Sequence, residues 1–275
     1  MPQPINTKVK VPVIECVSEA YAFLAAYWLK FLPAACAVAA ISTISAMLSS
    51  SAFLQLGFAL ISGLAGVAYI AAILRQQLYD QYTAPIGLGL GVDEFRLFAV
   101  TLLLALILVP VAFLLFMFGM AVLIARMEVS EAELEALTEQ PEALRDAVLG
   151  AATPSDILLA IILLAPLLWL AARLFIINAA TIGESKLAFA EAWRWSSGNA
   201  WRIAAAMTLT AAPLLLFNGI ILTIGPGMLN PSPQLAVIGV AATGIVSGIL
   251  RIPLIVLSAI LYQGLRVHPS GDREI

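Results

Sequence analysis

The residues of this sequence that could do chemistry are cations placed at the ends of long apolar segments or inside them. Arg173 and Arg251 each lie a turn or more inside a segment that is otherwise apolar. A charged side chain at the centre of a membrane helix costs about 2.5 to 3.5 kcal/mol, so a buried arginine needs a partner. The chemistry that this pattern favours is the binding of an anion, most simply a phospholipid headgroup.

The sequence does not decide which group pairs with these arginines. No predicted membrane segment contains Asp or Glu, which leaves lipid phosphate, water, or carbonyl groups freed near Pro213 and Pro253. We expect Arg173 and Arg251 to face the interior of a helical bundle. The predicted lipid-headgroup or anion site consists of Arg173, Arg251, Arg75, Lys30 and Arg202. The alternative is that each of these cations snorkels to the headgroups and only fixes the depth of its helix.

The sequence offers little for catalysis. Its one histidine, His268, lies near the C-terminus, and no cluster of His, Cys, Asp or Glu has the spacing of metal ligands. A serine in an apolar segment without histidine has no ordinary general base. We therefore expect a protein that is not an enzyme, with no catalytic residue, metal, cofactor or nucleic-acid partner.

Composition indicates a membrane protein in a single domain. Apolar residues make up 62% of the 275 residues and charged residues 11%, whereas soluble domains contain about 45 to 50% and about 25%. A helix needs roughly 20 apolar residues to cross a bilayer. The sequence predicts an all-α integral membrane protein with six transmembrane helices that form three hairpins, at 31–48, 52–74, 97–125, 157–177, 200–224 and 234–264.

Aromatic and charged residues predict two amphipathic helices at the membrane surface, at about 11–29 and 185–197. We expect Gly198 to break the second one and Asn199 to cap the next span. Amphipathic rings prefer the lipid interface, so we predict that Trp28, Trp193, Trp195 and Trp201 anchor the protein there. The alternative is that these helices form a docking face for a partner protein.

The distribution of charge predicts the orientation. Twelve of the fourteen Lys and Arg residues lie on the side of the N-terminus, the C-terminus and two of the connections. Cytoplasmic loops carry the excess of Lys and Arg, so both termini should be cytoplasmic. The segment 126–156, on the other side, holds eight of the seventeen acidic residues. It is either a solvated helical cap or a surface for a partner protein with a basic face.

The N-terminal part of the chain is repeated near its middle. Glu191-Ala192-Trp193, followed nine residues later by Arg202, matches Glu19-Ala20-Tyr21, followed nine residues later by Lys30. The runs EAWRWSSGNAWRI and SEAYAFLAAYWLKFLP, together with the Arg173 helix, resemble the YciC-like six-helix bacterial inner-membrane proteins. These are similar to the membrane domain of some glycerophosphoryl diester phosphodiesterases. The resemblance implies a six-span bundle in the bacterial inner membrane. In those phosphodiesterases catalysis belongs to a separate soluble barrel, for which this chain has no room. The acidic insert at 126–156, which the charge distribution places on the periplasmic side, is longer than expected of the family.

We therefore expect a non-catalytic inner-membrane protein that is accessory or membrane-organising and that binds anionic phospholipid. The alternative function is a transporter or lipid translocator that uses the arginine-lined cytoplasmic half of the bundle. A cavity wide enough for a headgroup and open to one leaflet would favour the alternative. A bundle tightly filled by Ala, Gly and Leu would favour the first function.

Overall fold

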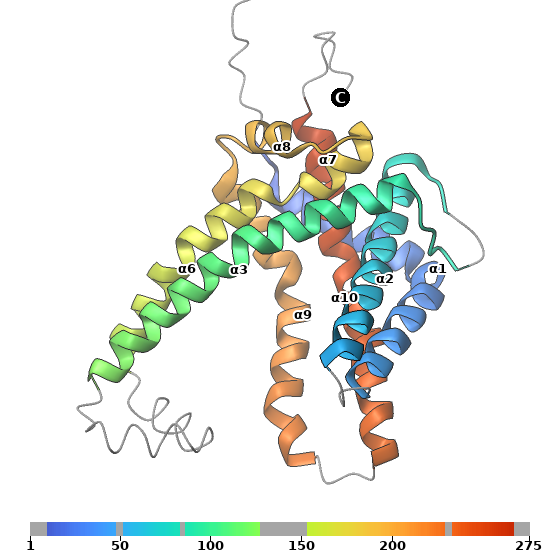
Figure 1. Cartoon of the computed structure of the whole chain (residues 1–275). Coiled ribbons are helices and arrows are strands. Elements are labelled where there is room, and N and C mark those ends of the chain that lie inside the picture. Colours follow the sequence, from blue (N-terminus) through green and yellow to red (C-terminus); the bar gives the residue numbers. More distant parts are fainter. Residues whose placement is uncertain (1–9, 48–51, 83–85, 127–152, 229–232, 267–275) are drawn as a thin grey trace, which may run out of the picture. The chain divides into compact units, whose positions relative to one another are not determined.

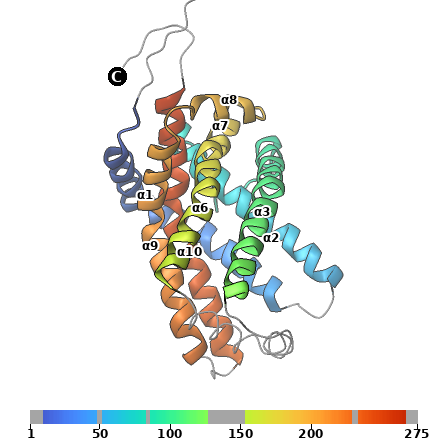
Figure 2. The ribbon, with the colours of Figure 1, turned by 90° about the vertical axis from the view of Figure 1, so that its left-hand side faces the viewer.

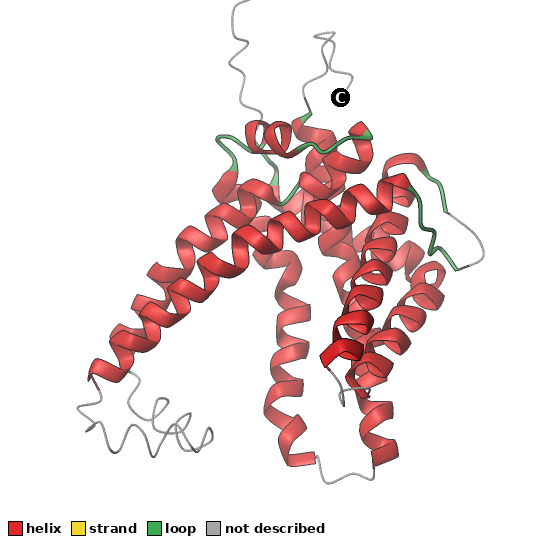
Figure 3. Cartoon of the chain, viewed as in Figure 1, coloured by secondary structure: helices red, strands yellow, loops and turns green. Residues whose placement is uncertain are grey.

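The computed structural model describes residues 10–47, 52–82, 86–126, 153–228 and 233–266, and these residues form helices joined by short turns and loops (Figures 1 and 3). The helices, in chain order, are α1 (Val13–Met47), α2 (Ala52–Tyr79), α3 (Val92–Arg126), α6 (Pro154–Leu174), α7 (Ile177–Glu184), α8 (Phe189–Trp195), α9 (Ala200–Met228) and α10 (Pro233–Leu265).

Six stretches of the described chain are helical, long and apolar enough to cross a membrane: Val13–Ser45, Leu54–Tyr79, Val92–Val122, Ile161–Glu184, Ala200–Thr223 and Val237–Leu265. Large apolar side chains on them are exposed, such as Leu106 at 70% and Leu222 at 75%. Soluble proteins rarely expose large apolar surfaces. Within the described residues, the prediction of an all-helical fold with six helices able to span a membrane is confirmed. The side on which each terminus lies and the pairing into hairpins stay predictions.

The chain divides into two compact units. Unit 1 comprises Met1–Leu102 and Ala172–Ile275, and unit 2 comprises Leu103–Ala171. In unit 1, α1 contacts α2, α9 and α10, and α7 contacts α2, α8 and α10. In unit 2, a β-carbon built at Gly119 of α3 would lie 3.5 Å from Leu163 of α6. All the cations and tryptophans that the sequence singled out belong to unit 1.

Small residues allow α1 and α10 to pack closely. A β-carbon at Gly244 of α10 would lie 3.1 Å from the Cβ of Ala39, and one at Gly248 would lie 3.5 Å from the Cβ of Ala35. Tyr69 of α2 donates a hydrogen bond of 3.1 Å to the carbonyl of Gly248. Because lipid supplies no hydrophobic force between helices, such close backbone approach is what holds them together. Figure 2 shows α9 running alongside α10, which completes the core of unit 1.

The first predicted surface helix and the first predicted span form one continuous helix. α1 has 35 residues and includes Pro33, so the expected division at Lys30 is absent. At about 1.5 Å per residue, α1 is longer than the roughly 30 Å apolar core of a bilayer. The repeat explains the difference, because Ala26 stands where the second copy has Gly198. Alanine favours a helix, and Gly198 instead takes a positive φ of 83° and separates α8 from α9.

The second predicted surface helix is shorter than expected and is preceded by a buried one. α7 ends where Ser185 takes a left-handed φ of 50°. Ile177, Ala179 and Ile182 of α7 are buried, so this helix belongs to the core of unit 1 rather than to a lipid surface. α8 lies within the predicted range of 185–197. In Figure 1, both short helices lie across the ends of α9 and α10.

The acidic insert predicted at 126–156 lies almost wholly outside the described residues, which stop at 126 and resume at 153. Its expected helical structure and its proposed partner stay predictions.

The contact between α1 and α10 gives a test of the packing. We expect Gly244→Leu to lower the melting temperature in detergent by several degrees, because the leucine would overlap Ala39. Gly239→Leu on the same helix is the matched control, since no atom lies within 4 Å of the β-carbon position there. An equal loss in both variants, measured by tryptophan fluorescence on heating, would contradict this account of the core.

Candidate functional site

The last turns of α2 connect four helices. Arg75 bonds to Glu94 of α3, Gln76 accepts a hydrogen bond from Lys30 of α1, and Tyr79 donates to carbonyl groups of α7. Arg75 and Tyr79, spaced i and i+4, lie on one face of α2, one turn apart, whereas Gln76 lies on a different face. The polar end of unit 1 is thus organised around α2.

A buried carboxylate holds the guanidinium of Arg75. Glu94 is 1% exposed, and its Oε1 accepts a hydrogen bond from Arg75 Nη1. Its Oε2 accepts one of 2.9 Å from the backbone N–H of Gly91, as a glutamate does at the third position of a helix. Arg75 also lies 3.6 Å from Asp93, which bonds at 2.8 Å to Arg96. The predicted headgroup ligand Arg75 therefore has protein carboxylates as partners.

Lys30 lies among aromatic rings. Its ammonium donates a hydrogen bond of 2.7 Å to Gln76 and lies 4.9 Å from the ring centre of Tyr82 and 5.7 Å from that of Tyr27. Tyr82 donates in turn to the Lys30 carbonyl, at 2.8 Å. The ammonium is thus stabilised by the π faces of two rings as well as by an amide oxygen.

Arg173 is buried, as expected for a residue facing the bundle. It is 8% exposed, and its guanidinium carbon lies 4.3 Å from the ring centre of Trp193 in α8. The backbone carbonyl of Arg173 accepts a hydrogen bond of 2.8 Å from the buried hydroxyl of Ser196. Trp193, predicted as a lipid anchor, therefore stacks on a buried arginine and joins α8 to the end of α6.

Arg251 differs from the expectation. It is exposed, whereas Ile252 and Val256 on the neighbouring face of α10 are buried. The two arginines that the sequence grouped as inward-facing therefore have different surroundings.

The junction of α8 and α9 binds the backbone of Val11 through two hydrogen bonds. Val11 donates its backbone N–H to Asn199 Oδ1 at 3.2 Å, and its carbonyl accepts from Arg202 Nη1 at 3.2 Å. The backbone carbonyl of Asn199 accepts from Ile203 at 2.9 Å, so Asn199 begins α9 as predicted while its side chain bonds to Val11. Arg202 thus has a structural contact in addition to its exposed position.

The remaining tryptophans fall into two groups. Trp28 and Trp201 are exposed, at 40% and 60%, as a lipid anchor would be. Trp195 instead packs against Tyr262 of α10, with ring centres 5.7 Å apart. Near this end, Lys186 donates to Glu191 at 2.6 Å, and this hydrogen bond lowers the pKa of the Glu191 carboxyl.

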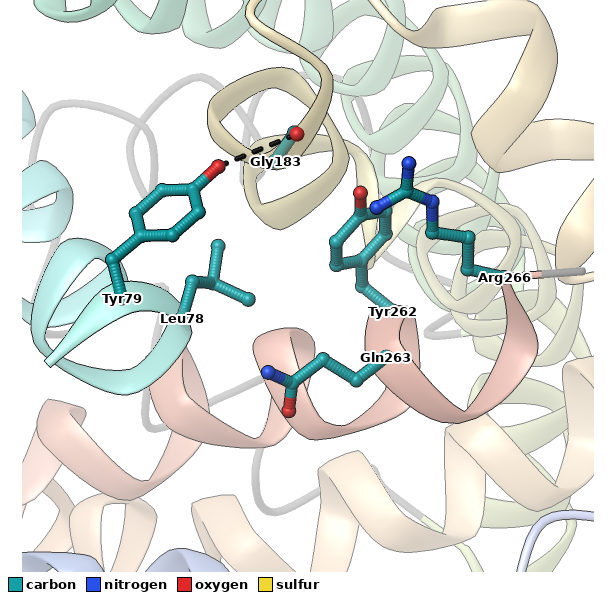
Figure 4. A pocket seen from close by; sticks show the side chains of 6 residues that line it. All are labelled: Leu78, Tyr79, Gly183, Tyr262, Gln263 and Arg266. Atoms are coloured by element: carbon teal, nitrogen blue, oxygen red, sulfur yellow. Dashed lines mark hydrogen bonds between the residues drawn. The ribbon is translucent and has the colours of Figure 1, made fainter. Parts of the chain in front are cut away.

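A pocket of about 240 Å³ opens at the ends of α2, α7 and α10 (Figure 4). Two of its lining residues contact Glu184: Tyr262 donates a hydrogen bond of 2.9 Å to the carboxylate, and Arg266 forms an ion pair with it, with Nε at 3.0 Å. A β-carbon at Gly183 would lie 2.4 Å from the Tyr262 hydroxyl, so any other residue there would displace the Tyr262 ring. The lining residues are Leu78, Tyr79, Gly183, Tyr262, Gln263 and Arg266.

Sequence reasoning missed this pocket and the burial of Glu94. Nothing in the spacing of Tyr79 and Tyr262 indicated that the two residues meet at α7. The signal for Glu94 was present, since a glutamate three residues after Gly91 in a glycine-rich loop fits the start of a helix.

Comparison with known proteins adds no family: no protein-family model, curated protein or solved structure matches the chain. The resemblance to the YciC-like proteins stays a prediction.

The buried pair of Arg75 and Glu94 gives a second test. We expect Glu94→Gln to lower the free energy of unfolding by about 3 kcal/mol, because it leaves a guanidinium without its main counter-charge. Asp93→Asn removes a more exposed carboxylate and should cost about 1 kcal/mol or less. Thermal unfolding of the purified variants in detergent measures both.

The double variant Arg75→Met with Glu94→Met is the control for this test. Replacing both charges by apolar side chains is often neutral, and Asp93 keeps Arg96 as its partner. We expect the double variant to be more stable than Glu94→Gln, and a further loss of stability would contradict the role given to the ion pair.

Proposed function

We propose that this multi-pass membrane protein is a non-catalytic, accessory or membrane-organising component of the bacterial inner membrane that binds anionic phospholipid. The observation that supports the proposal is a pair of exposed cations of the predicted anion site in unit 1, at α9 and α10: Arg202 and Arg251. Exposed arginines beside long apolar helices lie where lipid phosphates lie.

The geometry divides the predicted anion site into two parts. Lys30, Arg75 and Arg173 contact Gln76, Glu94 and Trp193, so these three cations hold helices together. The two exposed cations remain as ligands for lipid: Arg251, and Arg202, which uses Nη1 to bind the Val11 carbonyl but is exposed. Arg251 lies about three turns before Tyr262, and its long side chain can extend along α10 toward the phosphate level.

The position of the pocket favours binding over translocation. A translocator needs a polar path along the apolar length of the helices. The pocket at Tyr79 and Tyr262 lies instead at the ends of three helices. Along their lengths, α1 and α10 are closed by contacts such as Gly244 on Ala39.

Exchange of the exposed arginines tests the proposal. Each cation near an anionic surface contributes about 1 kcal/mol, so Arg202→Gln with Arg251→Gln should weaken phosphatidylglycerol binding by on the order of tenfold. Native mass spectrometry of the protein in mild detergent, titrated with this lipid, measures the change.

The matched control for this exchange removes exposed charges of the opposite sign. Glu15→Gln with Glu19→Gln changes two exposed carboxylates on α1 and should leave anionic lipid binding unchanged or stronger. Equal binding by the wild type and the arginine variant would overturn the proposal.

The proposed orientation has its own test. We expect alkaline phosphatase fused within the acidic segment 126–156 to be active, and the same enzyme fused after Arg266 to be inactive, because the Lys and Arg excess keeps that end in the cytoplasm. A green fluorescent protein fused at the C-terminus should give the complementary signal. The reverse pattern would reject the cytoplasmic placement of the termini.

A further inference from the structure

The pocket at the ends of α2, α7 and α10 presents hydrogen-bond acceptors on one side. Tyr79 donates its hydroxyl proton to the carbonyls of Ile182 and Gly183, at 3.2 and 3.3 Å. Tyr262 donates its proton to Glu184 at 2.9 Å. A tyrosine hydroxyl has only one proton, so each oxygen can offer the pocket only a lone pair. A ligand between the two tyrosines must therefore be a hydrogen-bond donor.

The electrostatics at this side favour a positive donor. Tyr79, Gly183 and Tyr262 lie in the last turns of three different helices, and each helix C-terminus carries about half a negative charge. Figure 4 shows the rings of Tyr79 and Tyr262 on opposite sides of the space. Aromatic faces attract cations, and an ammonium between these rings would have two hydroxyl oxygens and the Gln263 carboxamide within the same pocket.

The other side of the pocket presents donors. Arg266 uses Nε to contact Glu184 at 3.0 Å and lies over the Tyr262 ring, 5.8 Å from its centre. These contacts orient the guanidinium and leave its terminal amino groups at the rim, where Figure 4 shows them beside the pocket. The arginine is 37% exposed, so a phosphate can reach it from the membrane surface. The planar fork of arginine suits a phosphate group.

We propose that this pocket binds a zwitterionic headgroup with a primary ammonium and a phosphate, the phosphoethanolamine group. The ammonium lies between Tyr79 and Tyr262, and the phosphate lies on the terminal amino groups of Arg266. A volume of about 240 Å³ is below the about 300 Å³ at which pockets for drug-sized ligands begin, which suits a headgroup. Leu78 provides the apolar contact for the ethylene carbons. This site is separate from the anionic lipid surface at Arg202 and Arg251.

The test compares three phospholipids with the same acyl chains in native mass spectrometry of the full protein in detergent. Phosphatidylethanolamine should bind at least about tenfold more tightly than phosphatidylcholine, which lacks the N–H donors, and than phosphatidylglycerol, which lacks the ammonium. Equal or tighter binding of phosphatidylcholine at this site would overturn the proposal. Free phosphoethanolamine, added as a competitor, distinguishes the sources: displacement of the lipid shows that the headgroup alone is sufficient, and no displacement shows that the ligand is the membrane lipid.

Two variants localise the binding. Arg266→Gln and Gln263→Leu should each reduce the affinity for phosphatidylethanolamine several-fold, and Gln263 has an exposed side chain whose exchange leaves the fold intact. Arg194→Gln removes an exposed arginine from α8 and is the matched control. A preference for phosphatidylethanolamine that persists in both pocket variants would place the lipid elsewhere and reject this site. Loss of phosphatidylglycerol binding in the Arg202 and Arg251 variant, with phosphatidylethanolamine binding retained, separates this proposal from the proposed function.

Discussion

The packing of the helices in unit 1 depends on the ion pair and hydrogen bonds at the end of α2. Glu94 is buried next to Arg75, and a single buried charge without a partner costs several kcal/mol. The pair therefore fixes the start of α3 against the end of α2, with Gly91 completing the carboxylate's hydrogen bonds. One turn further, Tyr79 fixes α7 through its carbonyl groups. Polar contacts at one end thus set the positions that close packing of Gly244 on Ala39 maintains along the helices.

The short helix α7 explains why the polar end has a pocket at all. It ends at Ser185 in a left-handed conformation, so its last carbonyls accept hydrogen bonds from the Tyr79 hydroxyl of α2 instead of from a continuing helix. The Glu184 carboxylate accepts one from Tyr262 of α10. Gly183 lets Tyr262 approach to a distance that any other residue would prevent. The same tyrosine packs on Trp195, which connects the pocket to α8. Each tyrosine hydroxyl donates its one proton to α7 and keeps lone pairs that can accept a hydrogen bond from a ligand. The structural role uses the proton, and the proposed binding role uses a lone pair.

The two copies of the internal repeat show how a difference at one position decides between a continuous helix and two separate helices. In the second copy Gly198 takes a positive φ and separates α8 from α9, and Asn199 and Arg202 bind Val11. In the first copy Ala26 continues α1 past Lys30, whose side chain then reaches Gln76 and Tyr82. Glycine tolerates positive φ and alanine does not, so equivalent cations meet different partners. The pattern of aromatic and basic residues was visible in the sequence. Whether each copy forms a continuous helix or a helix break depends on one residue, Ala26 or Gly198.

The sequence by itself determined that the chain forms six helices long and apolar enough to cross a membrane, because an apolar segment of about 20 residues in lipid can satisfy its backbone only within a helix. It also identified Gly198 as the break before α9. It treated Arg173 and Arg251 alike, and of the two only Arg173 is buried. Only the tertiary structure decided which cations are bound by the protein. Arg75 meets Glu94 across 19 residues of chain, Lys30 meets Gln76 across 46, and Tyr79 meets α7 across 103. Contacts at such separations depend on the rotation of each helix about its axis and on the distance between helices. Close packing of small residues sets both, and hydropathy alone does not show which face of an apolar helix carries that packing.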